Sequence, residues 1–133
     1  MNDIRWKQRF QNFNRACDLL ERTAAEPDLS EAERGGLIQF FEMAFELSWK
    51  LLKDYLNAEG YEVKSPREAF KQAFQAGLIV NGGDWLTALE DRNLTSHTYD
   101  EETALRVEKK IRGQYLPLIR SLRSTFSGKV GDE

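Results

Sequence analysis

Cysteine and histidine are the scarcest reactive side chains in this chain of 133 residues. Cys17 is its single cysteine and His97 its single histidine. A disulfide needs two cysteines, and a structural zinc site needs four thiolate or imidazole ligands, so one chain can form neither. The carboxylates show no spacing that sets a magnesium site apart from solvated surface charge. We therefore predict no metal and no cofactor.

Long apolar runs and an excess of positive charge are also missing. No uninterrupted apolar stretch approaches the roughly 20 residues that cross a bilayer, and residues 1–9 are polar and basic without an apolar signal core. The formal net charge of −3 argues against a protein that coats duplex nucleic acid, although it leaves room for a local nucleotide or single-strand site. We expect a soluble, cytoplasmic protein with no membrane contact.

Only three prolines interrupt the chain, and apolar residues recur between them every three or four positions. This spacing places them on one face of an α-helix. Serine caps, prolines and glycines divide the pattern into separate segments. The predicted helices run from Asp3 to Ala25, from a cap at Ser30 to Glu59, from a cap at Ser65 to Gly77, from a cap at Asp84 to about His97, and from about Ala104 to Phe126 with a kink or restart at Pro117.

Five helical segments with no strand pair predict an all-α fold, an antiparallel up-down bundle of four to five helices. Residues 1–126 form the single predicted domain, and residues 127–133 are expected to be a flexible C-terminal tail. The helix at 30–59 carries more apolar residues than one stripe holds. Because large exposed apolar patches usually mark interfaces, we predict that a second copy covers this helix in a homodimer.

Residues 90–100 hold the densest group of reactive side chains in the sequence. Arg92 and His97 are five residues apart, about 140° around an unbroken helix, so they converge only if the helix ends between them. Thr95 and Ser96 are poor helix formers and favour such an ending. A guanidinium binds phosphate oxygens bidentately, and an imidazole takes or gives a proton near neutral pH. The pair suits cleavage of a phosphodiester without a metal.

In that reaction His97 would accept the proton of a ribose 2′-hydroxyl, and Arg92 would stabilise the pentacoordinate transition state. One histidine cannot also protonate the leaving oxygen, so two copies facing each other would divide the roles. The structural alternative carries equal weight. Arg92 could pair with Glu90, Asp91 or another surface acid, and His97 could be a polar helix end.

Other candidate side chains have a structural explanation too. Glu46 and Lys50 are four residues apart on one helix, which is typical of a modest surface ion pair. Trp49 and Trp85 could stack on a nucleobase, but aromatic residues at helical spacing lie in the core far more often. These residues alone support no functional claim.

Residues 92–99, RNLTSHTY, resemble the Arg-x4-His-x-Tyr motif of HEPN-domain proteins. The resemblance extends from Arg5 to Leu122 and implies a bundle like the substrate-binding domain of aminoglycoside nucleotidyltransferases. It also implies a separate minimal nucleotidyltransferase, encoded nearby, as partner. Further segments are similar to the branch called nucleotidyltransferase substrate-binding proteins, namely FE at 41–42, FELSWKLLK at 45–53, SPRE at 65–68, GLI at 77–79 and Trp85.

The resemblance implies, first, a HEPN-type subunit that binds nucleotide or another substrate for the nucleotidyltransferase and is not itself catalytic. Its cleft would be lined by Glu46, Lys50, Trp85 and the motif residue Thr98. This interpretation follows the name of the branch.

The alternative implied by the resemblance is a toxin-type, metal-independent ribonuclease with its site at the dimer interface. Arg92 and His97 match the catalytic positions, with Asn93 in an orienting role. Nucleotidylation of Tyr99 by the partner would then neutralise the toxin, because a bulky anionic adduct beside His97 obstructs RNA. Whether the chain is an enzyme stays open at this point.

Overall fold

The computed structural model of the chain describes residues 3–131, and this part of the chain is built from helices alone. The predicted all-α bundle is confirmed. Among the helices of residues 3–131, none combines the length and the apolar character that crossing a bilayer requires. In chain order the elements are α1 (Asp3–Ala24), α2 (Glu31–Ala58), α3 (Pro66–Gln75), α4 (Gly82–Asp91), the 3-10 turn η1 (Arg92–His97), α5 (Glu101–Lys110), the π-turn η2 (Ile111–Tyr115) and α6 (Leu116–Gly131).

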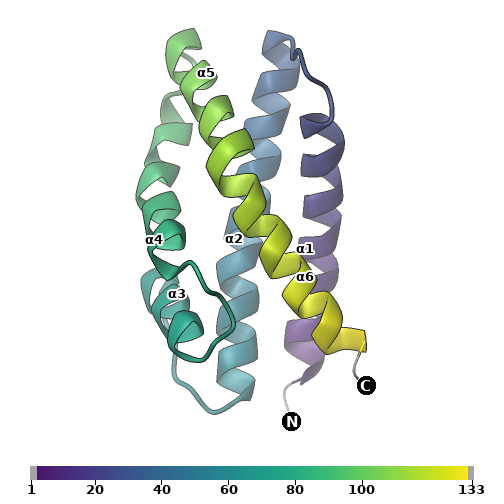
Figure 1. Cartoon of the computed structure of the whole chain (residues 1–133), viewed down its shortest axis with the longest axis vertical. Helices are drawn as coiled ribbons and strands as arrows, with labels where there is room; N and C mark the ends of the chain where they lie inside the picture. The colour runs from purple at the N-terminus through teal and green to yellow at the C-terminus, as the bar shows by residue number, and fades with distance from the viewer. Residues whose placement is uncertain (1–2, 132–133) are drawn as a thin grey trace.

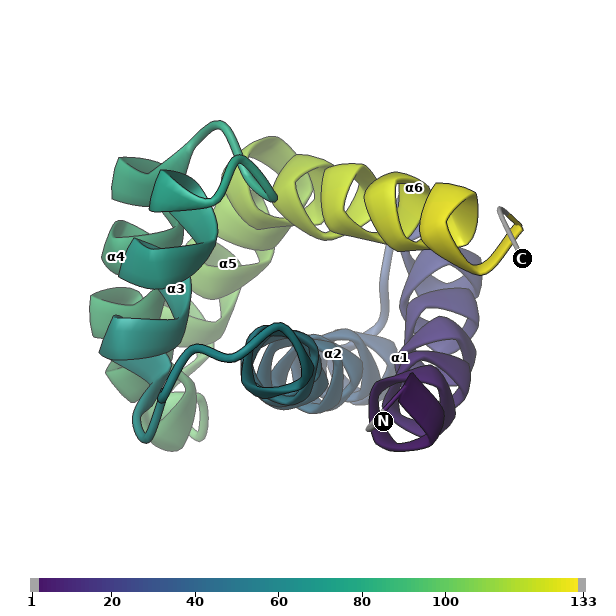
Figure 2. The ribbon, with the colours of Figure 1, turned by 90° about the horizontal axis from the view of Figure 1, so that it is seen from below.

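The bundle is elongated, with three long rods running along it (Figure 1). α1 and α2 are two of them, and α5, η2 and α6 together form the third, which crosses from the side of α4 at one end to α1 at the other. Seen end-on, α3 and α4 lie on the opposite side of the bundle from α1, with α2 between them (Figure 2). The core runs along the whole interior, and its largest fully buried side chains are Trp85, Phe13, Phe41, Phe45, Phe70 and Phe126.

Both predicted serine caps are present. The Glu33 N–H donates to Ser30 Oγ at 3.1 Å and the Ser30 N–H donates to Glu33 Oε1 at 2.8 Å, which completes the box at the start of α2. At α3 the Glu68 N–H donates to Ser65 Oγ at 3.2 Å. In a capping box the Glu68 carboxylate would accept from the Ser65 N–H. Here it accepts from the N–H of the residue before, Lys64.

The start of α4 and the end of α6 differ from the predictions. α4 begins at Gly82 and not after a cap at Asp84, and Asn81 precedes it without a side-chain cap bond. Gly82 itself packs closely on α3, where a Cβ would lie 3.0 Å from the Phe74 ring. At the C-terminus α6 continues to Gly131, so residues 127–131 of the expected flexible tail are helical, and residues 132–133 lie outside the described part.

The predicted restart at Pro117 is present in an unexpected form. The turn before it is a π-turn, in which the Leu116 N–H donates to the Ile111 carbonyl five residues earlier. Proline has no N–H to continue an α-helical ladder, and the wider turn absorbs the irregularity. α6 then proceeds as a regular helix from Leu116.

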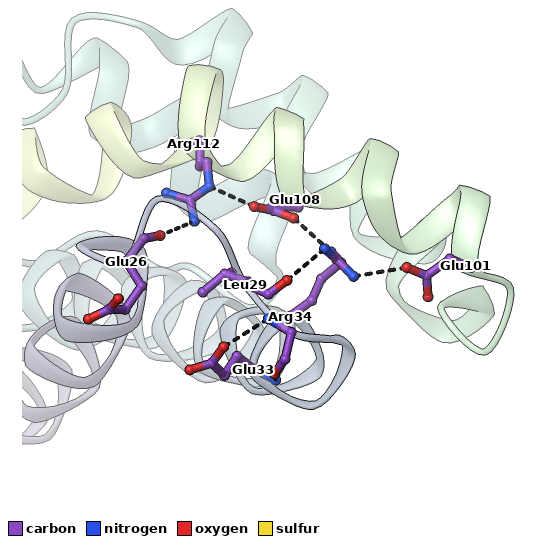
Figure 3. A network of polar contacts seen from close by, with 8 residues as sticks. Glu26, Leu29, Glu33, Arg34, Glu101, Glu108 and Arg112 are labelled. Atoms are coloured by element: carbon purple, nitrogen blue, oxygen red, sulfur yellow. Dashed lines mark hydrogen bonds and ion pairs between the residues drawn. The ribbon is translucent and has the colours of Figure 1, made fainter.

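Two guanidinium groups fasten the turn between α1 and α2 to the third rod (Figure 3). Arg34 Nε and Arg112 Nε donate to opposite oxygens of Glu108, at 2.7 and 2.8 Å. This network joins two segments that are far apart in the sequence, residues 24–34 and 101–112. The other acceptors are Glu101 Oε1 at 2.9 Å and Leu29 O at 3.1 Å for Arg34, and Ala24 O and Glu26 O, both at 2.8 Å, for Arg112.

Candidate functional site

The sequence motif lies on the 3-10 turn that follows α4 directly. The α-helix ends at Asp91, one residue before Arg92, and not between Arg92 and His97 as predicted. Side-chain bonds to the backbone accompany the change, since Thr95 Oγ1 donates to the Arg92 carbonyl at 2.7 Å and Ser96 Oγ to the Asn93 carbonyl at 2.8 Å. Short hydroxyl side chains favour such local bonds over a continued helix.

The 3-10 turn does not bring Arg92 and His97 together within one protomer. At three residues per turn, positions five apart still differ by about 120° around the axis. Arg92 lines a cleft beside α2, whereas His97 is exposed and is not part of the cleft wall. The side chains of one copy therefore present the cation and the imidazole to different directions.

Arg92 is held by α2. Its Nη1 donates to Glu46 Oε2 at 3.2 Å, and its guanidinium carbon lies 5.9 Å from the centre of the Phe45 ring. Lys50 Nζ is 3.5 Å from the other oxygen of Glu46. Of the acids that the sequence offered, neither Glu90 nor Asp91 pairs with Arg92. Glu46 and Lys50 do form their predicted ion pair, and Arg92 joins it.

The cleft lies between α2, the start of α3 and η1, and has a volume of about 790 Å³. It combines carboxylates, two amides, hydroxyls, a guanidinium and apolar surface. The buried indole N–H of Trp49 has no acceptor among residues 3–131. The wall consists of Gln39, Glu42, Met43, Glu46, Leu47, Trp49, Pro66, Arg92, Asn93, Thr95 and Ser96.

Trp85 does not line the cleft, which corrects its predicted place among the substrate-binding residues. Only 1% of its surface is exposed, and its ring stacks on Phe70 with centroids 5.0 Å apart and an interplanar angle of 19°. An indole packed between helices buries more apolar surface than one left free for a ligand. Thr98 is half-buried, and its hydroxyl donates to the Thr95 carbonyl at 3.2 Å.

Tyr99 is the most exposed large hydrophobic residue of residues 3–131, with 87% of its surface accessible. Its ring meets that of His97 edge-on, with centroids 6.2 Å apart and an interplanar angle of 70°. Asp100 then caps α5 by accepting from the Thr103 N–H and hydroxyl, at 3.3 and 2.8 Å. The phenol of Tyr99 is thus accessible to an approaching protein, and its ring contacts the imidazole of His97.

Asp91, Lys110 and Tyr115 form a group that sequence reasoning missed. Tyr115 Oη and Lys110 Nζ both donate to Asp91 Oδ2, the lysine at 2.9 Å. Burial opposes ionisation of Asp91, but these two hydrogen bonds outweigh it and lower its pKa. Burial first, and then the bond to Asp91, raise the pKa of Tyr115. No sequence signal links residues 91 and 115, because they lie on different helical segments.

Acidic and imidazole groups do not gather into a metal site in this part of the protein. Over residues 3–131, no three His, Cys, Asp or Glu side chains come close enough to hold an ion. The structure thus presents a motif that resembles that of HEPN-domain proteins, on a helical bundle with a cleft between its second helix and the turn after its fourth.

Comparison with known families agrees with this class. The family model described as nucleotidyltransferase substrate binding protein like matches residues 8–127, and the chain belongs to this family. The resemblance predicted from residues 92–99 and the segments around them is thereby confirmed.

Two relatives illustrate the similarity. A protein of Haemophilus influenzae named probable ribonuclease HepT is 36% identical over 81 residues, which cover 57% of this chain and 56% of that protein. The match thus spans little more than half the length of that relative. A crystal structure of a protein from Thermus thermophilus superimposes with a TM-score of 0.74 at 33% identity, covering 88% of this chain and 97% of that one.

Proposed function

We propose that this chain is the HEPN-type subunit of a two-component nucleotidyltransferase system and that it cleaves RNA without a metal. The observation that carries the proposal is the placement of the motif. The 3-10 turn directs Arg92 into an open polar cleft and leaves His97 and Tyr99 exposed beside it. The name of the H. influenzae relative, a probable ribonuclease, supports the same activity.

In the proposed reaction the neutral imidazole of His97 removes the proton of a ribose 2′-hydroxyl, and the 2′-oxygen attacks phosphorus. The bond to the 5′-oxygen breaks, and this oxygen leaves with a proton. The products are a 2′,3′-cyclic phosphate and a free 5′-hydroxyl. Arg92 stabilises the added negative charge, and the exposed Asn93 amide orients the phosphate.

A homodimer completes the proposed site. Because Arg92 and His97 of one copy face different directions, a second copy is needed to set an imidazole opposite the guanidinium. The second imidazole would also supply the proton for the leaving oxygen. Apolar surface on the cleft, where Met43 is 38% exposed beside Leu47 and Trp49, is available to such a neighbour.

Cleavage of single-stranded RNA in the presence of EDTA tests the activity. We expect His97→Ala and Arg92→Ala each to lower the rate about 100-fold or more, because general acid–base and charge stabilisation each contribute that much. Arg67→Ala is the matched control, since it removes a guanidinium that is exposed outside the cleft. Equal cleavage by wild type and His97→Ala would contradict the proposal.

A second function, a noncatalytic subunit that presents substrate to the nucleotidyltransferase, is favoured by the size of the cleft. About 790 Å³ lies within the range of small-molecule sites. Glu46 would contact the substrate there. Lys50 does not line the cleft and would act through its ion pair with Glu46, and the buried Trp85 would take no part. Equilibrium dialysis with ATP separates the two functions. ATP binding that Arg92→Glu abolishes, in a protein that leaves RNA intact, would favour the binding subunit.

Regulation by the partner is proposed to act at Tyr99. A nucleotidyl group on its phenol oxygen would place a phosphate two residues from His97 and repel RNA. Mass spectrometry after incubation with the neighbouring nucleotidyltransferase and ATP should find the adduct on wild type and on Tyr61→Phe, which alters another exposed tyrosine. An adduct that persists on Tyr99→Phe would rule out this acceptor.

A further inference from the structure

The π-turn η2 places Lys110 and Tyr115 on one side of the third rod. In an α-helix two residues five positions apart differ by about 140° around the axis and leave it on different sides. A π-turn bonds each N–H to the carbonyl five residues earlier, which sets such residues one above the other. The Leu116 N–H does donate to the Ile111 carbonyl. Both side chains consequently donate to Asp91 Oδ2.

Asp91 occupies the position where α4 changes into η1. It is the last residue of the α-helix, and Arg92 is the first of the 3-10 turn. Its carboxylate has no bond to its own backbone turn and is instead anchored across the bundle to Lys110 and Tyr115. The end of α4 is thus tied to a different element at the residue that precedes the motif.

The same stretch of α2 contacts both Tyr115, which bonds Asp91, and Arg92 of the motif. The Tyr115 ring stacks on Phe41, with centroids 5.2 Å apart and an interplanar angle of 18°. One turn further along α2, Phe45 lies under the Arg92 guanidinium and Glu46 pairs with it. Tyr115 and Arg92 are therefore positioned against neighbouring turns of one helix.

We infer that Asp91, Lys110 and Tyr115 act as positioning residues, which fix the point where α4 becomes η1 and thereby direct Arg92 into the cleft and His97 away from it. The expected effect on RNA cleavage rests on the proposed function, whereas the expected effect on the conformation of the turn does not. None of the three residues lines the cleft, so their effect is transmitted through the backbone of the turn.

Tyr115→Phe is the test variant, because it removes the hydroxyl that bonds Asp91 and keeps the ring on Phe41. Tyr55→Phe is the matched control. Tyr55 lies on α2 about four turns after Phe41, in an aromatic cluster with Trp6 and Phe126. The readout is the NMR spectrum, namely the Arg92 Nε–H and the backbone amides of residues 93–97.

We expect Tyr115→Phe to shift these signals and to raise their mobility, while Tyr55→Phe leaves them unchanged. The same signals in Asp91→Asn, which keeps an oxygen acceptor for Tyr115, should lie closer to their wild-type positions than those in Asp91→Ala. In RNA cleavage Tyr115→Phe should lower kcat about tenfold with KM within about twofold, since a misdirected catalytic group costs rate more than binding.

The two proposals fail separately. If wild type cleaves no RNA, the proposed function fails, and the NMR comparison still decides the inference. Unchanged signals of residues 93–97 in Tyr115→Phe, or equal shifts in Tyr55→Phe, overturn it. In a wild type that cleaves RNA, an unchanged kcat in Tyr115→Phe also overturns it.

Discussion

Glu46 holds two cations and so decides how available Arg92 is to a ligand. Its two carboxylate oxygens face Arg92 Nη1 at 3.2 Å and Lys50 Nζ at 3.5 Å. All three side chains are partly open to solvent, so each pair contributes little to the free energy of unfolding. The larger effect concerns binding, because a phosphate must compete with Glu46 for the guanidinium.

Glu46→Gln should tighten binding of a short RNA. The amide keeps a hydrogen-bond acceptor near Arg92 but removes the competing negative charge, and an exposed ion pair of up to about 1 kcal/mol corresponds to a gain of up to about fivefold in Kd. Fluorescence anisotropy at fixed salt measures it on the His97→Ala background, which prevents cleavage. Glu42→Gln, in the same cleft wall, controls for the change in net charge. An equal gain in both variants would contradict the competition.

Two glycines end helices in a conformation that other residues avoid. Gly60 has φ of +98° after α2, and Gly77 has φ of +79° after α3. This left-handed region costs a side chain roughly 1 kcal/mol, even where, as at Gly77, a Cβ would meet nothing within 4 Å. The chain reversals that follow α2 and α3 therefore depend on these positions.

Gly77→Ala should lower the free energy of unfolding by about 1 kcal/mol or more. Gly128→Ala is the control, and it should raise the free energy of unfolding. Gly128 is exposed within α6, where alanine is the better helix former by about 0.5–1 kcal/mol. Urea denaturation followed by circular dichroism measures both. A stabilised Gly77→Ala protein would refute the conformational argument.

The network around Glu108 should make stability depend on pH. Burial disfavours the charged form of Glu108, but the hydrogen bonds from Arg34 and Arg112 prevail and lower its pKa from the usual 4.5. A carboxyl whose pKa is lowered in the folded state stabilises the fold above its unfolded pKa and loses that contribution as pH falls. The loss should therefore begin near pH 5 and grow on further acidification.

Glu108→Gln should lower the free energy of unfolding at pH 7 by about 1–3 kcal/mol, because two guanidinium groups lose a carboxylate that is only 14% exposed. It should also flatten the dependence on pH between about pH 5 and about pH 3. Denaturation at a series of pH values measures both effects. Glu102→Gln, on the exposed start of α5, should keep the slope of wild type. Identical slopes in all three proteins would exclude the network as the cause.

The protomer buries most of the apolar surface that predicted a dimer. α2 lies between α1 on one side and α3 and α5 on the others, so Phe41, Phe45 and Leu52 are core residues of one copy. What remains outside is the apolar part of the cleft wall, with Met43 as its exposed member. In the proposed homodimer, the second copy would contact this wall, beside the motif.

Mixed dimers test this arrangement directly. If two imidazoles divide the base and acid roles in one site, a dimer with one wild-type and one His97→Ala protomer should retain almost no cleavage. Independent sites would retain about half of it. The mixed species is isolated through two different affinity tags, and dimers of two wild-type copies carrying the same tags are the control. Half activity would contradict the shared site, and sedimentation as a monomer would contradict the dimer.

The sequence alone determined the helices and the motif. Periodic apolar residues, the serine caps at Ser30 and Ser65 and the break at Pro117 are local signals, and the structure follows them within one or two residues over α1, α2 and α3. The motif around Arg92 and His97, together with the segments at 41–53, 65–68 and 77–85, also indicated the family, because all of them are read along the chain.

Only the tertiary structure decided which side chains meet. It buried Trp85 in the core, paired Arg92 with Glu46, and brought Tyr115 and Lys110 to Asp91 through a π-turn. It also moved the start of α4 to Gly82 and extended α6 beyond Phe126. The side-chain contacts among these outcomes join segments that are distant in the chain. Local spacing carries no information about such contacts, since their energy arises only once the helices lie against one another.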